Sequence, residues 1–297
     1  MPQFLGSFFK KRSGSDPDAS QEISPIKELL TLFGVFILLV FCFSMANLPG
    51  GDDWATFYGA TQRVLHNQQL YGTKINSFYL MYMPWDVLVV LPLGLLPFRV
   101  GWGVLSALSM VIIFLVMRRW KTSPFKLLLV LLSPPTFYIL LHGTIDAFVL
   151  SFMFLPYEFW LLGALSKPQN TIALGLNVLR SNLVKTAIVT GGVILLTFII
   201  LGNWVPAYLS QHTDFWSNEN NVMHLFFPYS IIVGLVMIYY GWKKNDVSFL
   251  VGASPMLSPY GATSSMLGPF MFLAVKLNDW QLLLVFLAYW GWALFKL

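Results

Sequence analysis

The sequence predicts an all-helical polytopic membrane protein, with about 8–10 transmembrane helices and an outer-face loop that re-enters the membrane. Composition gives the first indication: 57% of the 297 residues are hydrophobic, 10% are charged, and the mean hydropathy is +0.68. Soluble chains carry about a quarter charged residues. Apolar runs recur from Ile26 to the C-terminus, and they are Leu-rich without the period-2 alternation of membrane strands. Helices that cross a bilayer are therefore expected.

The basic residues indicate how the chain is oriented. Residues 1–25 are polar and contain Lys10, Lys11 and Arg12, which predicts a flexible cytosolic tail before a single transmembrane domain over 26–297. Basic residues next to apolar runs mark the cytoplasmic side, so the first span, 26–45, should lead outward. The net charge of +5 does not indicate nucleic acid, because the basic residues lie at helix ends rather than on one polar face.

Residues 47–98 are predicted to form one loop on the outer face. An amphipathic helix is expected over 54–67, directly after a polar stretch. The following apolar run, 82–97, offers only about a dozen residues between its outer prolines, and Asp86 lies among them, whereas a span needs about 20 residues. We expect this run to dip into the membrane and return to the same side.

The rest of the chain alternates between spans and broken segments. A span over 101–117 should return to the cytoplasm, because the basic cluster at 118–121 follows it. The segments between 145 and 180 are short, and Lys167, Pro168 and Gln169 interrupt them. Further spans are expected near 125–141, 186–201 and 223–240, and the region 247–295 has no clear orientation.

Two adjacent carboxylates, Asp52 and Asp53, are the first candidates for chemistry. They follow the first span at the lipid–water boundary, and ionisable residues embedded in a membrane usually have a function or a partner. Exclusion of water could raise the pKa of Asp53 into a range useful for a general base. The alternative is that one carboxylate caps the following helix. The pair could also chelate a divalent metal ion, and no other cofactor is predicted.

Lys167, Arg99 and Arg63 are the candidate anion-binding residues. Lys167 lies inside an apolar run and precedes a proline, and a helix break at membrane depth is a common way to build an anion site. A lysine whose ammonium reaches out to the interface is the alternative. Either arginine could bind a phosphate or pair with Asp52 or Asp86. His142 and Asp146 lie at the end of one span, but two ligands are too few for a metal site.

Several short motifs occur in order along the chain and together resemble a known family. They are Asp53-Trp54-x-x-Phe57-Tyr58-x-Ala60, Tyr82-Met83-Pro84, Pro92-Leu93-Gly94-Leu95-Leu96-Pro97, Gly143-Thr144-Ile145-Asp146, Lys167-Pro168-Gln169 and Ser258-Pro259-Tyr260. The pattern resembles the membrane glycosyltransferases of the GT-C fold, and is most similar to glycosyltransferase family 87, the mannosyltransferase-like group. Tyr-Met-Pro stands where that group has Tyr-Pro-Pro, Thr144 replaces the usual Gln, and the chain is short for the family.

The resemblance implies a GT-C bundle that transfers a sugar from a polyprenyl-phosphate donor to an acceptor hydroxyl, with inversion, on the extracytoplasmic side. It implies that Asp53, beside Asp52, is the catalytic base. It also implies that Lys167 and Arg99 lie near the donor phosphate, and Arg63, on the same outer side, is a further candidate from its charge. The expected substrate groove comprises Trp54, Tyr58, Tyr82, His142, Asp146, Gln169 and Tyr260.

Two other functions remain open at the level of sequence. A catalytically silent relative could serve as an integral subunit or scaffold of a larger membrane complex, and the short length would suit that role. A transporter of a lipid or small solute is the third hypothesis. The expected partners are membrane lipids, a polyprenyl-phosphate sugar and other membrane-protein subunits, without nucleic acid. We expect the protein to be integral to a bacterial plasma membrane, with its N-terminus in the cytoplasm.

Overall fold

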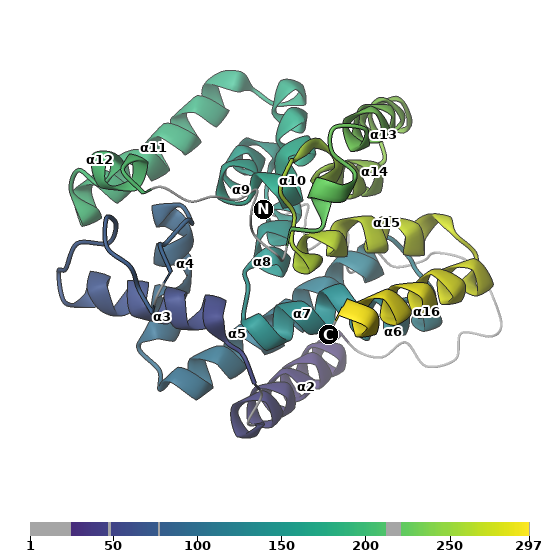
Figure 1. Cartoon of the computed structure of the whole chain (residues 1–297), viewed down its shortest axis with the longest axis horizontal. Helices are drawn as coiled ribbons and strands as arrows, with labels where there is room; N and C mark the ends of the chain where they lie inside the picture. Colours follow the sequence, from purple (N-terminus) through teal and green to yellow (C-terminus); the bar gives the residue numbers. More distant parts are fainter. Residues whose placement is uncertain (1–24, 47–48, 77, 212–220, 297) are drawn as a thin grey trace.

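The computed structural model describes residues 25–46, 49–76, 78–211 and 221–296 (Figure 1). The predicted tail over 1–25 therefore falls almost wholly outside the described residues. Helices make up 77% of the structure, and the described residues contain no strand. The all-helical class predicted from the sequence is confirmed.

Long and short helices alternate along the chain. The first half comprises α2 (Pro25–Met45), α3 (Asp52–Leu65), α4 (Pro84–Gly94), α5 (Phe98–Arg119), α6 (Pro124–Leu131), α7 (Pro134–His142), α8 (Asp146–Leu150), α9 (Trp160–Ser166) and α10 (Pro168–Gly175). The second half comprises α11 (Leu183–Leu201), α12 (Val205–Leu209), α13 (Ser230–Lys244), α14 (Val247–Ala253), α15 (Leu267–Lys276) and α16 (Asp279–Lys296). Short 3₁₀ turns join several of these, including η4 (Met223–Leu225) and η6 (Thr263–Met266).

Among the described residues, α5 and α11 are long and apolar enough to cross a membrane. A third span results if α6 and α7 form one bent unit, with 46° between them. The span predicted over 125–141 is thus broken rather than continuous, because Pro134 begins a new helix and cannot donate the hydrogen bond that would continue α6. The larger count of about 8–10 spans stays a prediction.

The polarity of α11 is the reverse of that in a water-soluble helix. Its buried residues are Thr186, Thr190 and Thr197. Its aliphatic side chains point outward, and Ile188 and Ile199 are 68% and 73% exposed. Small polar residues that face the bundle, with aliphatic residues outside, suit a helix surrounded by lipid. The structure is therefore consistent with an integral membrane protein.

The two helices of the predicted outer loop lie side by side. The first, α3, begins at Asp52, two residues before the predicted start. The second, α4, has 11 residues, about 17 Å of helix, so it is too short to cross a bilayer, as its sequence indicated. The Gln62 amide of α3 donates to the Gly94 carbonyl of α4 at 2.6 Å, and this contact fixes the pair.

Two indole groups connect the elements that carry the candidate site. The Trp54 Nε1–H of α3 donates to the Phe98 carbonyl at 2.9 Å, which joins α3 to the start of α5. The Trp102 Nε1–H of α5 donates to the Leu140 carbonyl of α7 at 3.0 Å. Both rings are buried, and the bond of Trp102 is shielded from water, whereas that of Trp54 is partly buried. The start of α3 and the end of α7 are therefore fixed relative to each other through α5.

The contact between α2 and α5 depends on the absence of a side chain at Gly103. A Cβ at this position would lie 2.3 Å from Ser44 Oγ and 3.0 Å from the Val40 carbonyl oxygen. We expect Gly103→Ala to lower the free energy of unfolding by about 1–3 kcal/mol, the usual cost of overpacking, measured as thermal unfolding in detergent. Gly191→Ala on α11 is the matched control, because nothing lies within 4 Å of its added Cβ. Equal unfolding temperatures for the two variants would contradict the close α2–α5 contact.

Candidate functional site

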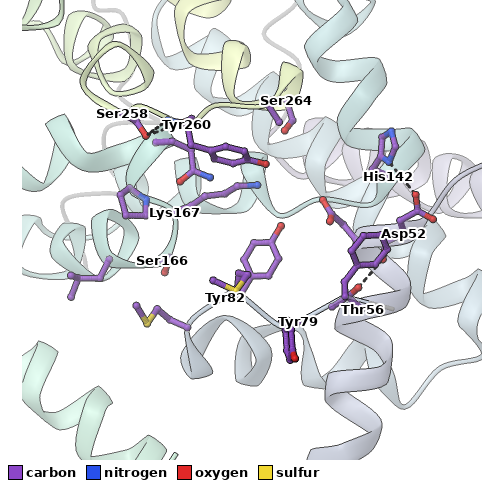
Figure 2. Close-up of a pocket in the computed structure, with 18 of the residues that line it drawn as sticks. Asp52, Thr56, Tyr79, Tyr82, His142, Ser166, Lys167, Ser258, Tyr260 and Ser264 are labelled. Atoms are coloured by element: carbon purple, nitrogen blue, oxygen red, sulfur yellow. Dashed lines mark hydrogen bonds and ion pairs between the residues drawn. The ribbon is translucent and has the colours of Figure 1, made fainter. Parts of the chain in front are cut away.

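A polar cavity of about 630 Å³ opens where α3, α7 and the break between α9 and α10 approach one another. Figure 2 shows Lys167 and Tyr260 reaching into it from one side, and Asp52 and His142 from the other. The loop before α4 and the segment before η6 complete the wall. The lining residues are Asp52, Asp53, Thr56, Phe78, Tyr79, Met81, Tyr82, Met83, Tyr138, His142, Leu165, Ser166, Lys167, Pro168, Gln169, Tyr208, Ser258, Tyr260, Ala262 and Ser264.

The acidic wall of the cavity is the first turn of α3. Gly51 is the N-cap residue, at φ +82°, a backbone conformation that favours glycine, and no side chain caps the helix. The alternative in which Asp52 or Asp53 caps α3 is therefore wrong. Both carboxylates lie in the first turn, where the helix dipole favours negative charge.

The Asp53 carboxylate is available to bind a ligand. Among the described residues it accepts no hydrogen bond, although Asp52, Asp146, His142 and Lys167 all act on it electrostatically. Burial raises the pKa of Asp53 above its ordinary value of 3.8, and the positive charge of Lys167 opposes that rise. A carboxylate with free lone pairs and a raised pKa can accept a proton from a bound substrate.

Asp52 lies nearer to the mouth of the cavity, where it faces a histidine. His142 Nδ1 and Asp52 Oδ2 are 3.9 Å apart, and the Asp52 side chain is 63% exposed. The imidazole stacks on the Tyr138 ring, with 4.0 Å between centroids and 27° between planes. The stacking holds the imidazole in place beside the acidic residues.

Lys167 forms the basic wall. It lies at the break between α9 and α10, because Pro168 begins α10, and the interruption indicated by the sequence is confirmed. Its ammonium pairs with the Asp146 carboxylate and lies 5.4 Å from the centroid of the Tyr82 ring. A lysine ammonium has three donors, so donors remain for a ligand in the cavity.

Asp146 lies behind Lys167 and is completely buried. Besides the ion pair, its oxygens accept a hydrogen bond from the Asn170 amide at 2.5 Å and one from the Thr144 hydroxyl at 2.5 Å. A buried ion pair needs such additional bonds to offset the desolvation of both charges. Asp146 therefore orients Lys167 rather than lining the groove, and no local sequence signal linked these residues, which are 21 positions apart.

Tyrosine side chains make up much of the remaining wall. Burial raises the pKa of Tyr82 well above 10.0, and that of Tyr260 to about 12. Both hydroxyls therefore stay protonated at neutral pH and can donate hydrogen bonds. Tyr82 is held in place by its ring contact with Phe57, at 4.3 Å between centroids, and its carbonyl accepts from the Tyr71 hydroxyl at 2.9 Å.

Part of the predicted site is brought together in the cavity, and part is not. The predicted residues that line it are Asp52, Asp53, Tyr82, His142, Lys167, Gln169 and Tyr260. Those that do not line it are Trp54, Tyr58, Arg63, Arg99 and Asp146. Trp54 has no exposed surface, and the Tyr58 ring packs on it and on Phe98.

Arg63 has a structural role in the loop before α4. Its guanidinium donates to the Thr73 hydroxyl at 2.8 Å and to the Lys74 carbonyl at 2.8 Å. A planar guanidinium can satisfy several acceptors of one loop at once. These bonds stabilise the loop that leads to Tyr82, and they do not place Arg63 at the cavity.

Some lining residues were missed at the level of sequence. Ser166 accepts a hydrogen bond from the Trp85 Nε1–H at 2.7 Å, which links α4 to the helix break. Tyr138, Tyr208 and Ser264 also line the cavity. They come from separate helices and turns, and only the tertiary fold brings them together.

The described side chains that could bind a metal ion do not form a complete metal site. Among the described residues no group of three or more His, Cys, Asp or Glu side chains converges on one point. A divalent ion beside Asp52 and Asp53 would take most of its ligands from water or from a substrate.

Comparison with known proteins identifies no relative. No protein-family model matches the chain, and the searches of curated proteins and of solved structures returned no match.

Proposed function

We propose that this protein is a membrane glycosyltransferase of the GT-C type, which transfers a sugar from a polyprenyl-phosphate donor to an acceptor hydroxyl. One observation carries the proposal: the uncommitted Asp53 carboxylate and the Lys167 ammonium line the same cavity, from opposite walls. An inverting transfer needs a base for the nucleophile and a positive group for the leaving phosphate.

The reaction can be written with these two residues. The acceptor oxygen attacks C1 of the sugar while its proton passes to Asp53. The bond between C1 and the phosphate oxygen breaks, and its electron pair leaves with the polyprenyl phosphate. Lys167 donates a hydrogen bond to the phosphate as negative charge develops there, while Asp146 holds the ammonium in position. Tyr82, whose ring centroid lies 5.4 Å from the same ammonium, offers its hydroxyl as a further donor.

A second cavity supports a substrate that carries a hydrocarbon chain. It has a volume of about 280 Å³ and an apolar lining that includes Phe226, Phe270 and Leu273. Ser264 lines the polar cavity and Met266 lines the apolar one, so both cavities border the short turn η6. A lipid with a polar head in one cavity and its chain toward the other would suit this arrangement.

The same ion pair favours a second candidate, a catalytically silent subunit of a larger membrane complex. Lys167 is already paired with Asp146, and no arginine of the described residues lines the cavity. If the Lys167 ammonium does not bind a donor phosphate and no sugar is transferred, the protein would serve as a scaffold. Such a subunit should purify with stoichiometric partners and release no polyprenyl phosphate.

The distinguishing experiment is a transfer assay in liposomes. The purified full chain is reconstituted with polyprenyl-phosphate mannose and a set of alkyl glycosides as acceptors. The expected result is formation of polyprenyl phosphate together with an elongated glycoside of inverted anomeric configuration. If no acceptor leads to release of polyprenyl phosphate and the protein purifies with bound partners, the result would favour the subunit and overturn the enzyme.

A further inference from the structure

The cavity contains more negative than positive charge. Asp52 and Asp53 line it on one wall, and the positive Lys167 on the other wall is matched by the buried Asp146 behind it. Leaving His142 aside, the three carboxylates and one ammonium carry a formal net charge of −2. A donor phosphate brings a further negative charge, and among the described lining residues Lys167 alone carries a permanent positive charge.

The negative charge at the first turn of α3 has no protein partner that satisfies it. The Asp53 carboxylate is half-buried and accepts no hydrogen bond from the described residues. Within the described parts of the chain, the Asp52 carboxylate faces the imidazole of His142, whose Nδ1 lies 3.9 Å away, beyond hydrogen-bond distance. A half-buried carboxylate without a counter-ion, beside an exposed one, indicates a site whose counter-ion arrives with the ligand.

Aromatic rings line the same cavity as these carboxylates. Tyr138 lines the cavity beside Asp52 and stacks on His142, and Tyr79 and Tyr82 line it from the loop before α4. The face of an aromatic ring attracts an ammonium group within about 6 Å, by about 0.5–2 kcal/mol. Carboxylates and aromatic rings together form a site for an organic cation, whereas a neutral sugar needs no charge.

We propose that the acceptor of this enzyme carries an ammonium group, as an amino sugar or amino polyol does, and that Asp52 binds that group. The inference rests on the proposed function and names the substrate class of the same cavity. The ammonium lies against Asp52 and the Tyr138 ring, which leaves Asp53 free to take the hydroxyl proton. The donor phosphate occupies the opposite wall, next to Lys167.

The proposal can be tested by equilibrium binding, without turnover. The probes are octyl glucosaminide, octyl N-acetylglucosaminide and octyl glucoside, titrated calorimetrically into the full chain in nanodiscs at pH 6.5. Only the first probe is charged. We expect it to bind at least about tenfold more tightly than both neutral probes, and Asp52→Asn to remove that difference. Asp279→Asn is the matched control, since Asp279 is exposed and pairs with Lys126 away from the cavity.

The outcomes separate this inference from the proposed function. Equal binding of charged and neutral probes to the wild type would overturn the cationic acceptor, whatever the transfer assay shows. A preference that survives in Asp52→Asn, or that Asp279→Asn removes equally, would overturn the assignment to Asp52. Tight, Asp52-dependent binding supports the inference even if sugar transfer fails. In that case only the proposed transferase activity is contradicted.

Discussion

Replacing Asp53 with asparagine is expected to reduce sugar transfer by a factor of about 10²–10⁴, the usual contribution of a positioned general base. The amide keeps the size of the side chain but cannot take the acceptor proton. Because the Asp53 carboxylate accepts no hydrogen bond from the described residues, its removal should leave the fold intact. The measurement is polyprenyl phosphate release in liposomes, with unfolding temperature as the check on folding.

The pH dependence of the wild type provides an independent readout of the same residue. Asp53 acts as a base only when deprotonated, so activity should rise as pH increases through its pKa. Burial raises that pKa above 3.8. The acidic limb of the pH–activity profile should therefore lie at higher pH than it would for an ordinary aspartate. Wild-type turnover by Asp53→Asn, or an acidic limb near pH 4, would rule out Asp53 as the base.

Asp146→Asn should have the largest effect on stability. The substitution leaves the Lys167 ammonium buried without its counter-ion, and breaking one partner of a buried pair costs about 3–5 kcal/mol. Because Asp146 also accepts from Asn170 and Thr144, the loss extends to that hydrogen-bond network. The measurement is the free energy of unfolding in detergent with increasing denaturant.

A double variant distinguishes the contribution of the ion pair to stability from that of the surrounding hydrogen-bond network. Asp146→Asn combined with Lys167→Met removes both charges, so most of the lost stability should return. Transfer activity should not return, because no positive group then faces the donor phosphate. A double variant as unstable as Asp146→Asn alone would show that the network, and not the ion pair, determines stability.

Features that depend on local sequence were predicted well. The first apolar helix ends at Met45 as expected, α4 is short, and Lys167 lies at a helix break. Prolines and run length decide each of these, and both can be read from neighbouring residues. The break before Pro134 and the glycine cap of α3 were missed, because hydropathy alone favoured one continuous span and acidic residues are common caps.

The candidate site was only partly predictable, because its residues come from distant parts of the chain. The pairing of Asp146 with Lys167 gives Asp146 a positioning role that no short motif could indicate. Arg63 resembled a phosphate ligand, yet the carbonyl groups of a nearby loop take up its guanidinium. Long side chains can reach several partners, and only the tertiary structure selects among them.

The most direct test is the structure of the full chain with polyprenyl phosphate in nanodiscs, determined by electron microscopy. We predict phosphate density within hydrogen-bond distance of Lys167, in the cavity that Asp53 lines, with the hydrocarbon chain leading toward the bilayer. A lipid phosphate bound elsewhere, or packed side chains that separate Asp53 from Lys167, would contradict the shared donor and acceptor cavity.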